Sequence, residues 1–260
     1  MADDFLLLSF VALLAGAVNS IAGGGTLLTF PVLYAALGST AEAAVVANAT
    51  NTVALVPAAM AALVGYRREL MQERRWVTLL IGPSLLGGMI GSLLLVTLPA
   101  DWFKVAVPWL ILGAALLFAL QPQVARWTGV GKPHATPSGR VAAGAIAFQL
   151  VVAIYGGYFG AGMGILMLAA LAMLGIADIH GMNAVKSLLG AVINGTSVVI
   201  FVATGNVNWP YALVMGAAAA VGGYVGAHTA RRVNRTVVRG VVVLLGFALA
   251  AYYFYREFAR

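Results

Sequence analysis

The sequence predicts an all-α protein that crosses a membrane many times, and two features of composition support this fold class. Hydrophobic residues make up 62% of the 260-residue chain, charged residues only 9%, and the mean hydropathy is +0.97. Soluble domains carry about 25% charged residues. The apolar residues also gather into long runs, most of them close to the roughly 20 residues that cross a bilayer as one helix.

Each apolar run is expected to form membrane helix, in chain order. The runs cover residues 5–37, 43–64, 76–98, 103–120, 141–174, 184–203, 210–227 and 237–254. The first and fifth runs are too long for one straight crossing, and glycines interrupt them at 23–25 and 160–164. The polar, Pro- and Gly-containing stretch 122–139 is predicted to link a first transmembrane half, 1–121, to a second, 140–260.

The two halves resemble each other, which indicates internal duplication. Gly23 and Gly25 match Gly160 and Gly162, and Asn48-Ala49 matches Asn183-Ala184. A second set of glycines also repeats, and there we expect the small residues to permit close helix packing. These are Gly87, Gly88 and Gly91 in the first half and Gly222, Gly223 and Gly226 in the second.

Charge placement predicts that the two halves are inverted. Four arginines lie in 66–75, whereas the equivalent loop 205–209 is uncharged; four others lie in 231–239, opposite the weakly charged 97–104. Basic residues mark cytoplasmic loops, so equivalent loops lie on opposite sides, with the linker cytoplasmic and both termini periplasmic. Each half then needs a glycine-broken hairpin, which leaves on the side it enters, plus three transmembrane helices. This arrangement gives 8 to 10 membrane segments.

The motifs around the glycines resemble those of a known family. Residues 15–33 read AGAVNSIAGGGTLLTFPVL, with ANATN at 47–51, and the second half has YFGAGMG at 158–164 and HGMNAVK at 180–186. Over essentially the whole chain they resemble the TauE/SafE sulfite exporter family, also called TSUP or DUF81. The resemblance implies transport of sulfite or organosulfur anions such as sulfonates across a bacterial inner membrane, often outward and driven by the proton gradient. One departure is Leu168, opposite Pro31, where the family often has a proline; a milder second break is therefore expected.

The residues themselves favour an anion as the ligand. A helix that restarts after glycines presents free N–H groups and the positive end of its dipole. Lys186 is the one basic residue deep in an apolar run and is a candidate cation for the substrate; snorkelling to the cytoplasmic surface is the alternative. Asn19 and Thr26 could bind the anion or merely cap the broken backbone. The candidate substrate-binding residues are Asn19, Gly23, Gly24, Gly25, Thr26, Asn48, Asn51, Gly160, Gly162, Asn183 and Lys186.

Asp178 and His180 are candidates for proton coupling, although Asp178 at a helix start could simply be an N-cap. No catalytic residue, metal or cofactor is expected, because the chain has no cysteine, no His-Glu-x-x-His motif and no paired transmembrane aspartates. An enzyme is therefore not expected.

The expected function is secondary transport of small sulfur-containing anions across the bacterial inner membrane, by alternating access around a midplane site. An anion channel and a transporter of non-sulfur small carboxylates remain alternatives, and proton coupling stays open. The expected partners are the anionic substrate and membrane lipid, with homodimer formation left open. Nucleic acid is not expected, because the basic residues cluster at the ends of the apolar runs.

Overall fold

The computed structural model describes residues 2–21, 24–65, 67–128, 139–176, 178–229 and 235–258. Over these residues the all-α prediction is confirmed. The helices are α1 (Ala2–Ile21), α2 (Gly25–Ala36), α3 (Ala41–Gly65), α4 (Arg67–Gln72), α5 (Arg74–Thr97), α6 (Ala100–Thr128), α7 (Gly139–Tyr158), α8 (Met163–Met173), α9 (Ile179–Ala203), α10 (Trp209–Thr229) and α11 (Arg235–Phe258).

Several of these helices have the dimensions of membrane spans. Within the described ranges, six are long and apolar enough to cross a bilayer: α3, α5, α6, α7, α9 and α11. Two further apolar helices, α2 and α8, are shorter, with 12 and 11 residues. Both follow the glycine interruptions. Because six of the described helices can span a bilayer, the chain is a multi-pass membrane protein, and α2 and α8 are two short helices within its bundle.

Several boundaries differ from the sequence prediction; the short helix α4, for example, lies within the predicted loop 66–75. Helix α6 continues through Pro122 to Thr128, so the start of the predicted linker is helical; residues 129–138 lie outside the described ranges. Lys104, expected in a polar loop, lies near the beginning of α6 because that helix already starts at Ala100, with Asp101 in its first turn. An acidic residue there stabilises a helix start.

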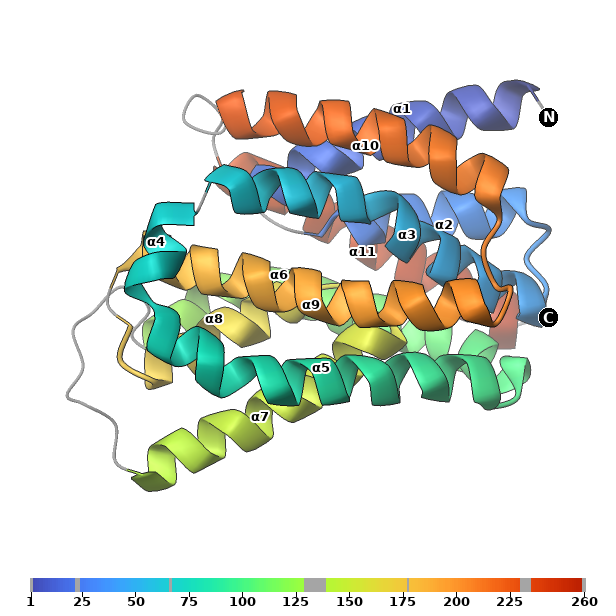
Figure 1. Cartoon of the computed structure of the whole chain (residues 1–260). Helices are drawn as coiled ribbons and strands as arrows, with labels where there is room; N and C mark the ends of the chain where they lie inside the picture. Colours follow the sequence, from blue (N-terminus) through green and yellow to red (C-terminus); the bar gives the residue numbers. More distant parts are fainter. Residues whose placement is uncertain are drawn as a thin grey trace.

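Most helices run along one common direction, with both chain termini at one end of the bundle (Figure 1). We call this the termini end, and the opposite end, where α6 stops and α7 starts, the linker end. Helix α1 enters from the termini end, and α2 returns to it. Helix α7 enters from the linker end, and α8 returns there, so the two interrupted hairpins enter the bundle from opposite ends.

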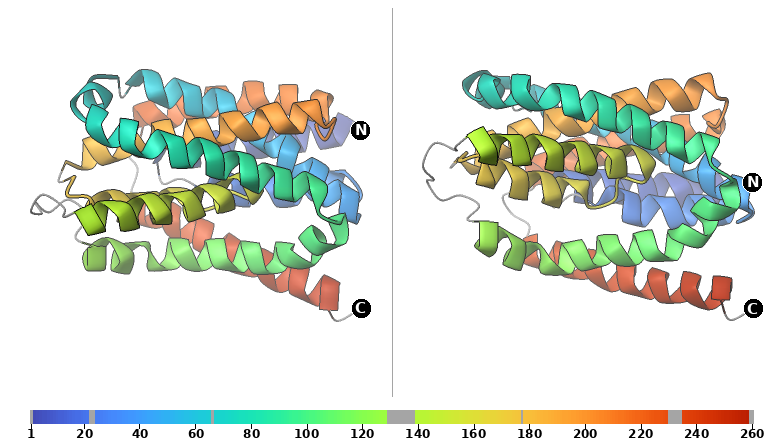
Figure 2. Two further views of the ribbon diagram at one scale, coloured as in Figure 1. Left: turned by 60° about the horizontal axis from the view of Figure 1, so that its bottom comes forward. Right: turned by 90° about the horizontal axis from the view of Figure 1, so that it is seen from below.

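The largest helix contacts join the two halves of the chain. Helix α10 packs along α1, and α5 packs along α7; α3 packs on α10, and α9 on α5. Helices α6 and α11 lie side by side along one edge (Figure 2). The first helix of each half is therefore paired with a later helix of the other half, and the halves are interlocked.

Small residues make these inter-half contacts possible, as the sequence predicted. A Cβ atom added to Gly222 or Gly226 of α10 would collide with the backbone of Leu13 or Ala17 on α1. The same holds for Gly91 of α5 against the backbone of α7. Glycine lets two helix backbones approach closely within a membrane, so the expectation that these glycines serve helix packing is confirmed.

Replacing Gly91 with alanine is expected to push α5 away from α7 and to lower the stability of the protein. Overpacking of this kind costs about 1–3 kcal/mol. Gly82 lies on the same helix, and a Cβ there meets nothing within 4 Å. Gly82→Ala is therefore the matched control, expected to be neutral or slightly stabilising. Thermal unfolding in detergent measures both variants, and equal melting temperatures would contradict the packing role of Gly91.

Candidate functional site

The first helix break separates α1 from α2. Helix α1 ends at Ile21, and α2 starts after Gly24, which has a φ of 94°. Residues that carry a side chain rarely adopt this backbone conformation, so glycine is the residue that fits. Gly24 has no side chain to cap the first turn of α2, although its carbonyl accepts from the Leu27 N–H across 3.0 Å. Gly25 and Thr26 lie within that turn, whereas the predicted site residue Gly23 lies outside the described residues.

The second break is as complete as the first, which corrects the expectation of a milder one. Helix α7 ends at Tyr158, and α8 starts after Gly162; Gly160 and Gly162 both have a φ of 79°. The phenolic OH of Tyr155 donates to the Ala161 carbonyl across 2.5 Å and so holds the loop against α7. The missing proline is irrelevant, because Pro31 lies inside α2 and glycines make both breaks.

One turn of α3 contacts both interrupted hairpins. The Asn48 amide Nδ2 donates to the carbonyl of Tyr158, the last residue of α7, across 3.0 Å. One turn later, Asn51 Oδ1 accepts a hydrogen bond from the Thr29 hydroxyl of α2, which also lies 3.0 Å from the Gly25 carbonyl. Asn48 therefore reaches the second break, while Asn51 reaches the helix that restarts after the first.

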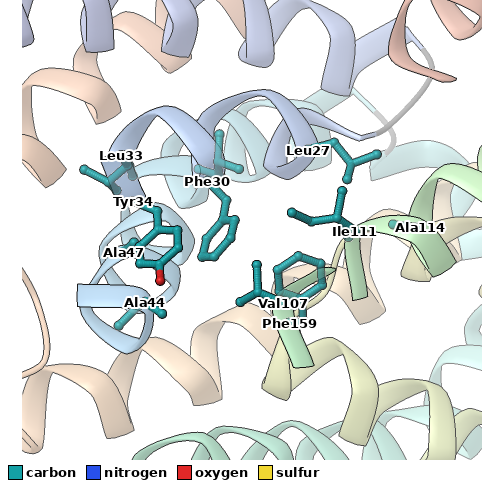
Figure 3. Packing of buried hydrophobic residues seen from close by; sticks show 14 of the residues in the cluster. Leu27, Phe30, Leu33, Tyr34, Ala44, Ala47, Val107, Ile111, Ala114 and Phe159 are labelled. Carbon is teal, nitrogen blue, oxygen red and sulfur yellow. The ribbon is translucent and has the colours of Figure 1, made fainter. Parts of the chain in front are cut away.

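One turn of α6 contacts the same two breaks from another direction. A Cβ on Gly24 would collide with the Phe118 ring, whereas a Cβ on Gly162 would lie 3.7 Å from Ala114 Cα. The rings of Phe30 on α2 and Phe159 in the second break make an edge-to-face contact at 5.4 Å. Figure 3 shows the rings of Phe30 and Phe159 close to each other, with Val107 of α6 beside Phe159. The two breaks, distant in the sequence, therefore meet inside the bundle.

The α3 side of this meeting point is polar and buried. Asn48 and Asn51 are each only 1% exposed. Because Asn48 Nδ2 is used by the Tyr158 carbonyl, the orientation of the amide is set, and Asn48 Oδ1 has no hydrogen-bond partner within the described part of the chain. A buried acceptor without a donor is costly. Asn48 therefore offers an acceptor to a donor from outside the chain.

The second half contributes a cation beside the start of α8. Lys186 is half-buried, and its alkyl chain passes Gly164, where an added Cβ would lie 3.3 Å from Lys186 Cδ. Its ammonium group donates to Asn183 Oδ1, one turn earlier on α9, across 2.9 Å. Gly164 itself belongs to α8 and not to the break. The lysine thus points toward the linker end, the direction that snorkelling requires.

The predicted binding residues therefore fall into two groups. Hydrogen bonds join Asn48 to Tyr158 at the second break and Asn51 to Thr29 of α2, whereas Asn183 is joined to Lys186. Asn19 is exposed near the end of α1. Sequence reasoning missed Thr29, whose hydroxyl links α2 to α3, because a threonine inside an apolar run gives no signal of its partner.

The two proton-coupling candidates lie at the linker end, and there Asp178 is a helix cap. Its carboxylate accepts from the backbone N–H groups of His180, at 3.2 Å, and Gly181, at 2.8 Å. The N-cap alternative is thus confirmed for Asp178, and His180 is exposed on the first turn of α9. Proton coupling by either residue stays a prediction.

Glu73 is a carboxylate at this end that the sequence analysis did not single out. It stands directly before α5, and its Oε1 lies 2.8 Å from where a Cβ on Gly181 would be. Partial burial raises the pKa of the Glu73 carboxyl, and the negative charge of Asp178 raises it further. The contact with α9 was not predicted, because the four arginines of this stretch indicate an ordinary cytoplasmic loop.

A multi-pass bundle in which two interrupted helices enter from opposite ends and meet beside buried amides has the construction of a membrane transporter. The sequence supports that class directly. The chain belongs to the family described as Sulfite exporter TauE/SafE, which it matches over residues 8–253.

Several known proteins are similar to this chain over nearly its whole length. It is 29% identical over 244 residues to the probable membrane transporter protein YfcA of Escherichia coli, covering 94% of this chain and 87% of that protein. It is 27% identical over 250 residues to a probable membrane transporter protein of Haemophilus influenzae, covering 96% and 94%. No solved structure matches the chain.

We expect Glu73→Gln to stabilise the protein at neutral pH but not in acid. The folded protein holds the Glu73 proton more tightly than the unfolded chain, so wild-type stability falls as the pH rises from the ordinary pKa of 4.5 through the raised value. The neutral glutamine avoids that loss, and a gain of about 1–3 °C in melting temperature is expected at pH 7.5.

Melting temperatures in detergent between pH 4 and pH 8 measure this effect. Glu42→Gln is the control, since Glu42 is exposed in the first turn of α3 at the termini end. A gap between Glu73→Gln and wild type that does not shrink as the pH falls would contradict the assignment.

Proposed function

We propose that this chain is a secondary carrier of small sulfur-containing anions, such as sulfite and sulfonates, in the bacterial inner membrane. The observation that carries the proposal is the meeting of both helix breaks against one turn of α3, beside the buried and unpartnered Asn48 Oδ1. The family description, Sulfite exporter TauE/SafE, supports the choice of sulfur anions.

The proposed anion lies between the breaks and is bound mainly by backbone. Helices α2 and α8 both restart there after left-handed glycines, so the positive ends of their dipoles favour a negative charge. The N–H groups of Leu27, Met163 and Ile165 are bonded to carbonyls of the breaks, so the anion is expected at other N–H groups of these first turns. Asn48 Oδ1 accepts a hydrogen bond from the O–H of hydrogen sulfite, or from a water that accompanies a sulfonate. Lys186, whose alkyl chain passes Gly164 and whose ammonium group bonds Asn183, adds a positive charge on the linker side of the breaks.

The interlocked halves supply the moving parts in this proposal. Inverted repeats are supported by the opposite directions of the two hairpins in Figure 1 and by the exchanged packing of α1 on α10 and α7 on α5. Basic loops mark the cytoplasmic side, so the arginine-rich linker end is assigned to the cytoplasm and both termini to the periplasm. Rocking of one half against the other would then open the breaks to each side in turn.

The experiment is uptake of radiolabelled sulfite or isethionate into proteoliposomes. We expect saturable uptake, and we expect Lys186→Gln and Asn48→Asp to weaken it at least tenfold. Asn48→Asp keeps the side-chain shape but places a negative charge where the anion binds, and it also removes the donor to the Tyr158 carbonyl. Arg126→Gln is the control, because Arg126 is exposed near the end of α6 and its side chain bonds only the Pro122 carbonyl of its own helix in the described structure.

Each outcome decides a different point. Normal uptake by folded Asn48→Asp protein would show that the substrate does not bind at the breaks. Large single-channel currents in a planar bilayer would favour an anion channel over a carrier. Equal competition by small carboxylates would contradict specificity for sulfur anions.

A further inference from the structure

A small pocket lies at the termini end, apart from the meeting point of the breaks. It is formed by the end of α2, the start of α6 and the end of α11, and its volume is about 100 Å³. We call it the terminal pocket, and its polar lining residues are Tyr34, Ser39, Lys104, Tyr253, Arg256 and Glu257.

The terminal pocket holds two cations and one carboxylate. Lys104 Nζ lies 3.5 Å from Glu257 Oε1, a distance longer than a hydrogen bond, and the two side chains are 35% and 19% exposed. Arg256 also lines the pocket and is close enough to Tyr34 and Tyr253 to interact electrostatically with both. Glu257 neutralises at most one of the two positive charges, so the pocket is positive overall.

A row of aromatic rings connects the terminal pocket to the breaks. Tyr253 stacks on Tyr34 with ring centroids 5.7 Å apart, and Tyr34 stacks on Phe30 at 5.7 Å. Phe30 in turn contacts Phe159 of the second break. The pocket therefore stands at the outer end of the rings that separate the breaks from the termini end.

Two hydrogen bonds hold this row in place. The Tyr253 hydroxyl donates to the Pro31 carbonyl of α2 across 3.2 Å, and the Tyr34 hydroxyl donates to the Ser39 carbonyl across 3.2 Å. Both tyrosine protons are thus used by backbone carbonyls. The charged groups of Lys104 and Arg256 remain as the donors that a ligand in the pocket can reach.

We infer that the terminal pocket is a binding site for small oxyanions, with Lys104 and Arg256 as the donors and Glu257 as a competitor that occupies Lys104 when no anion is bound. The further role of this pocket, as the site that captures the transported anion, rests on the proposed function. Anion binding by the pocket does not depend on that function. Loss of Glu257 should therefore strengthen anion binding, whereas loss of Lys104 should weaken it. Opposite signs follow from the two charges alone, so the readout specific to anion binding is protection of a thiol in the pocket by a competing oxyanion.

The test uses the absence of cysteine from the chain. Ser39→Cys places one thiol in the pocket, and its rates of modification by an anionic reagent (sulfonatoethyl methanethiosulfonate) and a cationic one (trimethylammonioethyl methanethiosulfonate) are compared, each relative to a free thiol. We expect the anionic reagent to be favoured. Lys104→Gln should lower that preference and Glu257→Gln should raise it, each by about threefold or more, as expected for one charge a few ångströms away. Isethionate should slow modification.

Thr204→Cys is the control thiol, exposed at the end of α9 and outside the pocket. Neither charge substitution should change its reagent preference. An unchanged preference at Ser39→Cys, a change of the same sign for both substitutions, or modification that isethionate does not slow would overturn the inference. The readout needs no transport, so labelling that follows the expected signs in a protein without uptake would refute the proposed function alone. Normal uptake with a charge-insensitive Ser39→Cys thiol would refute the terminal pocket alone.

Discussion

The hydrogen bond from the Asn48 amide to the Tyr158 carbonyl is the contact on which the arrangement of the site depends. Tyr158 ends α7 inside an apolar bundle, where water cannot satisfy the carbonyls that a helix end leaves free. Asn48 meets that requirement from the other half of the chain. Since Asn51, one turn later, accepts from Thr29 of α2, the same helix turn fixes both interrupted hairpins at one depth.

Close helix packing makes that contact possible. The glycines of α5 let its backbone approach that of α7, and the glycines of α10 let its backbone approach that of α1, because no side chain stands between them. Each interrupted hairpin is therefore held mainly by the half of the chain to which it does not belong. In the proposed cycle, a movement of one half must therefore carry the hairpin of the other. This coupling links the packing glycines to transport, although they lie away from the breaks.

Much of this architecture could be predicted because its signals are local. Glycine runs within apolar segments indicate the breaks, the repeated small residues indicate tight packing, and Asp178 before an apolar run indicates a cap. The contacts between distant elements could not be predicted: Asn48 and Tyr158 are 110 residues apart, and nothing in the arginine-rich 66–75 segment shows that Glu73 meets α9. The expectation of a milder second break was wrong because it gave weight to the missing proline, whereas Pro31 lies inside α2 and glycines with positive φ lie at both breaks.

The central claim is that one anion binds where the two breaks meet. The most direct test is a crystal structure with bromoethanesulfonate, whose bromine can be located by anomalous scattering. We expect a sulfonate between the first turns of α2 and α8, within hydrogen-bond distance, about 3 Å, of N–H groups there and linked to Asn48 directly or through one water. A bromine signal confined to the terminal pocket or to the lipid-facing surface, with the breaks closed around protein alone, would contradict it.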